Sequence, residues 1–234
     1  MGITGAGGAI TAIPLFQIFV NSTLKEATVL SLITVFFGTV VNLLSRMREV
    51  NWRIALGLTL SGTVANYLSL PLKTKMPESV IVILLIMIGL FSISSIWRSP
   101  KSGENATKET NFVTVILIGL FLGLITTLTG LGGGVLLIPL LLRVFGMSYE
   151  EALPTSLGSI MLISLSALFF QGEKALELIK VEEILYLGAG ALAAFATLKL
   201  ILRYFSPAQV LKLRKLVFSM ATLISLIIVI FKAT

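Results

Sequence analysis

The residues of this chain that could do chemistry are backbone groups exposed by a glycine-rich segment, and that segment occurs twice. Residues 4–14 read TGAGGAITAIP, and residues 129–139 read TGLGGGVLLIP, 125 positions later. The match extends downstream to Glu26, Ala27 and Ser31, which fall on Glu151, Ala152 and Ser156. A helix that starts after such glycines leaves its first amides unpaired and its positive dipole end free, an arrangement that binds anions. The repeat therefore predicts an anion cradle built from two helix N-termini.

Glycines would supply the cradle, and hydroxyls next to them would complete it. The predicted cradle residues are Gly5, Gly7, Gly8, Gly130, Gly132, Gly133 and Gly134, with Ser31, Thr155 and Ser156 as flanking donors. Further hydroxyls are available at Thr4, Thr11, Thr126, Thr127 and Thr129. Pro14 and Pro139 follow inside the helices and are expected to bend or loosen them. The alternative is that the glycines only let helices pack closely. We favour binding because the cluster is dense and occurs twice at matched positions.

Composition identifies an integral membrane protein. The chain of 234 residues is 56% hydrophobic and 12% charged, with a mean hydropathy of +1.01, and long apolar runs follow one another along it. It has neither cysteine nor histidine, so we expect no disulfide, no metal site of thiolates or imidazoles, and no cofactor. The net charge of +7 comes from basic residues in short loops. We interpret it as a topology signal and expect no nucleic-acid partner.

Apolar runs bounded by charges predict six spans, near 27–45, 54–72, 79–97, 152–170, 182–202 and 208–231. The run from 112 to 145 differs, because as one helix it would be about 51 Å long and glycines interrupt it. It predicts two pieces, near 112–128 and 135–145. In the first half only the second piece remains, near 9–20. We expect that this half is naturally short or that the recorded start lies too far downstream.

The distribution of Lys and Arg decides between two ways of threading 112–145. A single crossing would leave nine basic residues on each side of the membrane, which is no bias. Entry and exit on one face instead puts twelve on that side: Arg46, Arg48, Arg53, Arg98, Lys101, Lys108, Arg143, Lys199, Arg203, Lys212, Arg214 and Lys215. The positive-inside rule favours this second arrangement, with the twelve in the cytoplasm.

The predicted fold is therefore an all-α polytopic membrane protein made of two inverted repeats. Residues 1–98 and 112–234 form the repeats, and the polar residues 99–111 form a cytoplasmic linker. Each repeat would contain a glycine-broken helical hairpin plus three transmembrane helices, the first repeat lacking its leading helix. Inverted repeats that share a site near the bilayer midplane are typical of secondary transporters.

Polar residues within the predicted spans are few. Glu26 and Glu151 lie in first helical turns, where a carboxylate complements the helix dipole. The sequence places no carboxylate in the middle of a span and has no aspartate, which argues against a cation pump with a buried carboxylate and against an enzyme. The amides Asn42, Asn66 and Gln171 are of a type that more often bridges helices than binds ligands.

These motifs resemble the TauE/SafE family of membrane proteins, the sulfite exporter group. In the second half, Pro139 is followed by EALPTS at 151–156, and in the first half Pro14 is followed by EATVLS at 26–31. The likeness covers essentially the whole chain. It implies an inner-membrane permease that exports sulfite or a related organosulfonate such as sulfoacetate. Leu30 stands where the second half has Thr155, so one hydroxyl of a symmetric pair is absent.

The function predicted from these observations is export of a small anion by alternating access. The expected partners are the anion and the lipid bilayer of a prokaryotic cell, and a homo-oligomer is allowed but not required. Two alternatives stay open. One is a membrane scaffold or assembly protein without transport of its own. The other is a passive anion channel, because channels and carriers can share anion sites at helix ends.

Overall fold

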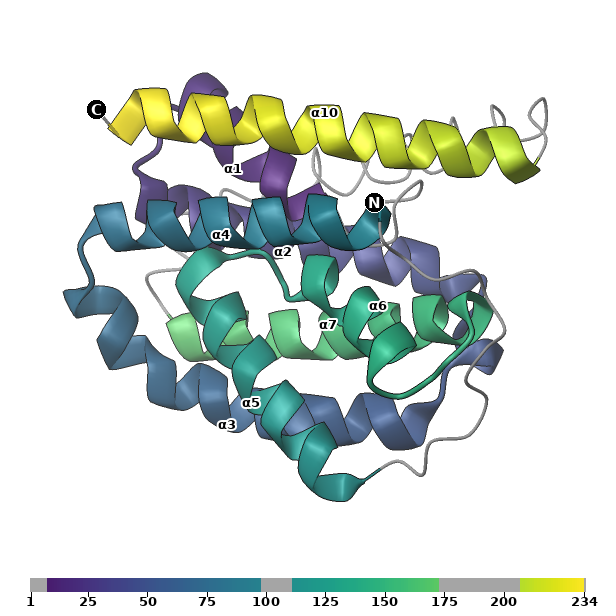
Figure 1. Ribbon diagram of the computed structural model, residues 1–234. Helices are drawn as coiled ribbons and strands as arrows, with labels where there is room; N and C mark the ends of the chain where they lie inside the picture. The colour runs from purple at the N-terminus through teal and green to yellow at the C-terminus, as the bar shows by residue number, and fades with distance from the viewer. Residues whose placement is uncertain (1–7, 98–110, 173–206, 234) are drawn as a thin grey trace.

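The computed structural model describes residues 8–97, 111–172 and 207–233, and these residues form helices without any strand (Figure 1). The elements are α1 (Gly8–Phe19), α2 (Leu24–Leu44), the 3-10 turn η1 (Met47–Glu49), α3 (Trp52–Lys75), α4 (Glu78–Trp97), α5 (Phe112–Thr129), α6 (Gly134–Arg143), α7 (Tyr149–Gln171) and α10 (Pro207–Ala233). The expected all-α architecture is confirmed for this part of the chain. Five of the six predicted spans correspond to α2, α3, α4, α7 and α10. The sixth, near 182–202, lies outside the described residues.

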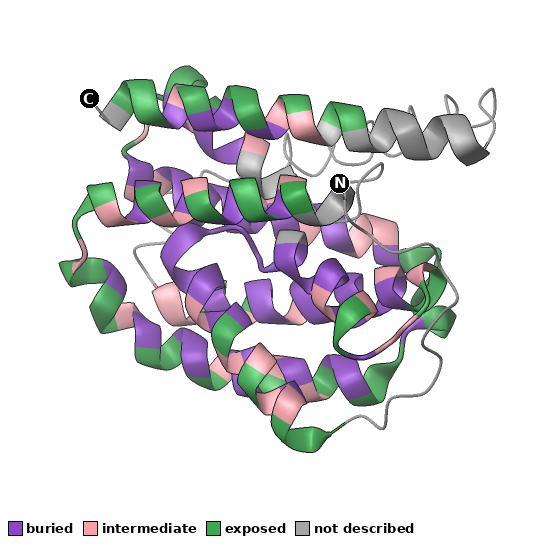
Figure 2. Ribbon diagram, in the orientation of Figure 1, coloured by how far each residue is buried: buried purple, intermediate pink, exposed green. Residues whose placement is uncertain are grey.

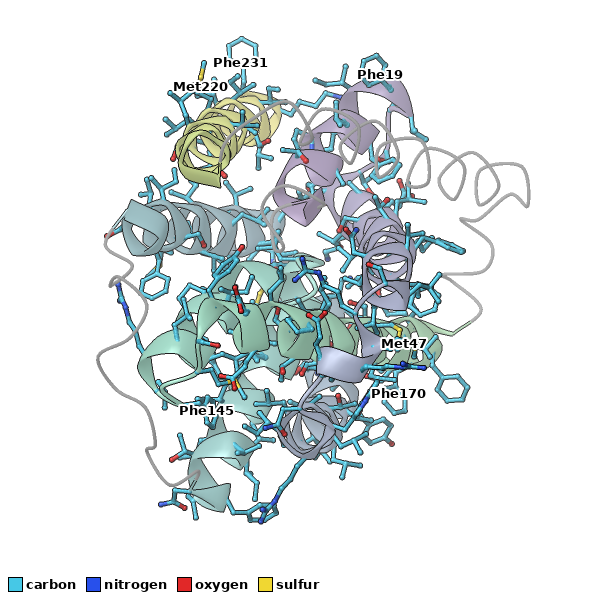
Figure 3. All side chains as sticks on the ribbon, turned by 90° about the vertical axis from the view of Figure 1, so that its right-hand side faces the viewer. Phe19, Met47, Phe145, Phe170, Met220 and Phe231 are labelled. Atoms are coloured by element: carbon cyan, nitrogen blue, oxygen red, sulfur yellow. The ribbon has the colours of Figure 1, made fainter. Side chains whose placement is uncertain are left out.

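Three of the described helices, α2, α5 and α7, are long and apolar enough to cross a membrane. Large apolar side chains also cover the outside of the bundle, where Figure 2 shows exposed residues along α3, α4 and α10. Phe19, Met220 and Phe231 point away from the bundle in Figure 3. A soluble protein of this size rarely exposes so continuous an apolar surface. The chain is an integral membrane protein, as its composition predicts.

α2 and α7 begin with the same hydrogen-bonded cap. The amide of Glu26 donates to Thr23 Oγ1 over 3.3 Å, and the Glu26 carboxylate accepts the Thr23 amide at 2.8 Å. The amide of Glu151 donates to Ser148 Oγ over 3.3 Å, and its carboxylate accepts the Ser148 amide at 3.1 Å. These reciprocal bonds are capping boxes. Both matched glutamates therefore fix helix starts, which agrees with the structural role expected for them.

The two capped helices run in opposite directions through the bundle. At one end, which we call the Lys73 end, Lys73 Nζ donates to Gln171 Oε1 at the end of α7 over 2.9 Å. There Lys25, at the start of α2, donates to the carbonyl of Thr74 over 3.3 Å. The other end is the Asn51 end. Asn51 precedes α3 and follows α2 by a short connection, and its amide donates to Thr155 Oγ1, near the start of α7, over 3.1 Å. Antiparallel α2 and α7 fit inverted repeats, which remain a prediction.

α3 and α5 lie side by side at backbone contact and run in the same direction. A methyl group at Gly123 would overlap the backbone of Gly62, and one at Gly119 would lie 2.6 Å from the Leu58 carbonyl oxygen. Further along, Thr127 Oγ1 donates to Asn66 Oδ1 over 2.9 Å. Small residues four apart allow this close approach between membrane helices. α5 therefore starts at the Asn51 end and stops short of the Lys73 end.

After α5 the chain turns at buried glycines, and α6 leads back towards the Asn51 end, where α7 begins (Figure 1). α5 and α6 thus form a hairpin that enters and leaves the bundle at one end. Its sides pack into the apolar core, which includes Leu122, Leu137 and Ile160. The geometry agrees with the threading that the basic residues favour.

Replacing Gly123 by Ala should destabilise the bundle by about 1–3 kcal/mol, because the methyl group meets backbone that has no room to move. Gly158→Ala is the matched control, since its nearest contact is a Val50 side-chain carbon at 3.3 Å. Thermal unfolding in detergent measures both variants. Equal melting temperatures for the two would contradict the close crossing.

Cysteine labelling tests the hairpin, because the natural chain contains no cysteine. Phe112→Cys and Glu150→Cys, both at exposed positions at the Asn51 end, should react with a membrane-impermeant thiol reagent from the same side. Lys75→Cys, exposed at the Lys73 end, should react only from the opposite side. Labelling of Phe112→Cys and Glu150→Cys from opposite sides would mean that 112–145 crosses the membrane once.

Candidate anion-binding site

The turn between α5 and α6 depends on glycine at three positions. Gly130 ends α5 with φ 71°, and its amide donates to the Thr126 carbonyl over 2.9 Å. Gly132 and Gly133 have φ 65° and 68°. The backbone of a residue that carries a side chain rarely adopts this left-handed region, whereas glycine does so without steric cost. The spacing of glycines in the second repeat motif is therefore the spacing that this turn requires.

Ser31 of α2 holds the turn in place. Its hydroxyl oxygen lies 2.7 Å from the carbonyl oxygen of Gly130 and 2.9 Å from that of Thr28, so its one proton is donated to either. A methyl group at Gly130 would overlap the Thr28 carbonyl. The predicted flanking donor Ser31 does lie at the glycine turn. In this conformation it binds the turn itself.

Buried amides at the start of α6 lack acceptors. The residues Gly132, Gly133 and Gly134 are all buried, and the N–H groups of Gly132 and Gly133 donate no hydrogen bond within the described chain. They form the N-terminal end of a helix, where the dipole is positive. A buried amide without a partner costs about 1–3 kcal/mol, so such groups normally meet water or a ligand.

Two hydroxyls beside these amides also lack partners. Thr126 Oγ1 of α5 and Ser164 Oγ of α7 are two of the four buried side-chain atoms without a hydrogen bond in the described part of the chain. Both residues are 0% exposed. A methyl group at Gly133 would lie 3.3 Å from Thr126 Oγ1, and one at Gly132 would lie 3.0 Å from Ser164 Oγ. The orphaned hydroxyls and the orphaned amides therefore share one place in the fold.

This cluster can bind an anion without any charged side chain. Two amides and two hydroxyls are all able to donate, and the hydroxyls can turn towards a ligand. Helix N-termini bind phosphate- and sulfate-like groups through the same combination of free amides and dipole.

Of the other predicted site residues, Thr155 and Ser156 lie away from this turn. Gly5 and Gly7 lie outside the described residues, and Gly8 begins α1. Thr155 and Ser156 lie near the start of α7, about nine residues or 13 Å along the helix from Ser164. The Thr155 hydroxyl accepts the Asn51 amide there, and the Ser156 hydroxyl donates to the carbonyl of Leu153 over 2.8 Å. Their part in a site stays a prediction.

Both prolines lie inside the helices that follow the glycines. Pro14 is the seventh residue of α1, and Pro139 is the sixth of α6. A proline at either place removes the bond that its amide would donate to the carbonyl four residues earlier. The helices continue through both positions, and a bending role remains a prediction.

Sequence reasoning missed Ser164 because a serine in an apolar helix usually bonds its own backbone. Only the turn packed against it shows that this serine has no partner. Thr126 is one of several hydroxyls that the sequence places beside the second motif. Asn66 bridges helices as expected: its Nδ2 donates to the Ile163 carbonyl over 3.0 Å and to Ser166 Oγ over 2.7 Å.

Comparison with known proteins adds two findings. The family model described as Sulfite exporter TauE/SafE matches residues 1–228. A probable membrane transporter protein of Methanocaldococcus jannaschii is 26% identical over 174 residues, which is 70% of this chain and 64% of that protein. The chain thus spans less than two thirds of the relative's length. No solved structure matches the chain.

Ser31→Ala should loosen the glycine turn, because it leaves the buried Gly130 carbonyl without its donor. We expect a loss of about 1–3 kcal/mol in unfolding free energy and faster hydrogen exchange at residues 130–134. Ser92→Ala is the control, since the Ser92 hydroxyl is equally buried and donates only to its own helix, at Ile88. Unchanged exchange at the turn in Ser31→Ala would show that Ser31 does not anchor it.

Proposed function

Because the chain belongs to the TauE/SafE sulfite exporter family, we propose that it is a secondary transporter exporting a small anion. The proposed substrate is sulfite or an organosulfonate, and the proposed location is a prokaryotic inner membrane. The protein is a transporter in this proposal and has no enzymatic activity. The observation that supports it best is the glycine turn, where four buried donors have no acceptor in the described part of the chain.

A sulfur oxyanion matches the donors in number and kind. Sulfite and sulfonate groups each present three oxygens, which accept hydrogen bonds from amides and hydroxyls and donate none when ionised. The amides of Gly132, Gly133 and Gly134 would bind the oxygens from the helix end. Thr126 and Ser164 would complete the shell from α5 and α7. Anion charge would be balanced by the helix dipole.

A second half-site is expected in the first repeat. Glycines 5, 7 and 8 would form it, flanked by Thr155 and Ser156. The contact between Ser31 and Gly130 supports this idea, because the repeat relates that pair to Ser156 and Gly5. An anion held between two such turns would lie at the boundary of the repeats, as in transporters with inverted repeats.

Alternating access is the proposed mechanism, with one repeat rocking against the other. α3 of the first repeat and α5 of the second touch through backbone at Gly62 and Gly123. A contact without intervening side chains changes little when helices rotate about it, so we propose this crossing as the pivot. Proton coupling would have to use the substrate, water or the glutamates at helix starts, because the chain has no histidine or aspartate.

Radiolabelled sulfite flux in proteoliposomes, with and without an imposed proton gradient, tests the proposal. Thr126→Val and Ser164→Ala should each raise the KM for sulfite about tenfold, since each removes one donor to a charged ligand. Ser159→Ala is the control on the same helix, because its buried hydroxyl already donates to the Thr155 carbonyl over 2.9 Å. Gly132→Leu and Gly133→Leu should abolish flux.

Each contrary outcome selects one alternative. Flux that stays intact in properly inserted Gly132→Leu and Gly133→Leu protein would show that the glycine turn does not bind the transported anion. Flux that follows only the sulfite gradient and never saturates would indicate a passive channel. Absence of flux for both sulfite and sulfonates would favour the alternative of a membrane scaffold protein without transport of its own.

A further inference from the structure

Lys73 is a buried cation that the glycine turn does not use. It lies in the last turn of α3 and is 7% exposed. Its ammonium donates to the amide oxygen of Gln171 at the end of α7 over 2.9 Å, and this acceptor is neutral. Burying a charge is costly unless an opposite charge compensates it. The position of Lys73 therefore needs an explanation.

A second lysine makes the position electrostatically worse. Lys25 donates to the carbonyl of Thr74, next to Lys73, over 3.3 Å, close enough for the two ammonium groups to repel each other. In residues 8–97, 111–172 and 207–233 the one ion pair joins Arg46 and Glu49, at the opposite end. The nearest carboxylate along α2, Glu26, is held by the Thr23 amide. Among the described residues, no carboxylate lies within 4 Å of either ammonium group.

The lysines lie along the same helix face as the glycine turn. Ser164, whose free hydroxyl is beside Gly132, and Gln171, which binds Lys73, are seven residues apart on α7. Seven residues are about two turns and 10 Å, so both side chains lie on one face. The turn and the lysines are therefore successive polar positions on the way to the Lys73 end of the bundle.

We propose that Lys73, Lys25 and Gln171 form a second anion site, at which the transported anion stops between the glycine turn and the aqueous space. The proposal rests on the proposed function and extends it. The two ammonium groups would supply charge, and the Gln171 nitrogen, which gives one N–H to the Ala167 carbonyl over 3.1 Å, would add its second N–H as a donor. The anion would be the missing counter-charge.

The second site complements the first in its chemistry. The turn offers neutral donors at depth, whereas the lysines offer full charges near the surface, where they raise the local concentration of anions. The basic-residue count assigns the Asn51 end to the cytoplasm, so the Lys73 end faces outward. Lys73 would then receive an anion on its way out.

The test compares Lys73→Gln with Lys75→Gln, a control that removes the same charge two residues away at an exposed position. Lys73→Gln should raise the KM for sulfite about tenfold or more in proteoliposomes with little change in kcat. Lys73→Arg should stay within threefold of the natural chain, because it keeps the charge. Lys75→Gln should change the KM less than twofold.

A binding measurement keeps the inference separate from transport. Added sulfate should raise the melting temperature of the detergent-purified natural chain, and this rise should shrink at least by half in Lys73→Gln but not in Lys75→Gln. If no anion is transported, the proposed function fails, and the sulfate effect alone decides about Lys73. An equal rise in both variants overturns the site.

One further outcome would also overturn it. Glu173 follows Gly172 in the sequence and lies outside the described residues, so its carboxylate is the competing partner. In that case Lys73→Gln would lower the melting temperature without added anion and leave both the KM and the sulfate effect unchanged. Glu173→Gln would then lower the melting temperature similarly.

Discussion

Unpaired backbone groups within the bundle are the constraint on which the rest of this structure depends. A chain that turns inside a membrane protein exposes amides and carbonyls that lipid cannot satisfy, so the surrounding protein must cover them. Here the turn after α5 is covered by α2 and α7, and Ser31 reaches the Gly130 carbonyl. The amides that remain unpaired at Gly132 and Gly133 are then available for a ligand. The same feature is therefore a structural cost and the basis of the proposed site.

The neighbouring helices are shaped to accept this turn. α3 and α5 approach each other most closely at glycines, so the hairpin lies deep against the first half of the chain. The polar bridge from Thr127 through Asn66 to Ser166 and the Ile163 carbonyl then joins α5, α3 and α7 just before the turn. Thr126 and Ser164 lie within one residue of this bridge, yet their hydroxyls have no partner in the described part of the chain.

The sequence predicted the helices and the turn because both depend on local chemistry. Apolar runs and glycines determine where helices start and stop, and the repeated Ser/Thr-x-x-Glu pattern marks the capped starts at Thr23 and Ser148. Ser31 is predictable because it matches Ser156 across the repeat. Ser164 and the environment of Lys73 could not be predicted, since a partner missing from a buried group is visible only once distant helices are packed. The roles of Thr155 and Ser156 depend on Gly5 and Gly7, outside the described residues.

The hairpin also constrains the order in which the protein assembles. α2 and α3 precede α5 in the chain and therefore leave the ribosome first, whereas α7 follows the hairpin. Domains and segments near the N-terminus generally fold first during synthesis. The Gly130 carbonyl can thus accept the Ser31 hydrogen bond as soon as the turn is made, because α2, which carries Ser31, is already in the bilayer. The free amides on its other side stay uncovered until α7 is inserted, and only then would the protein gain the ability to bind an anion.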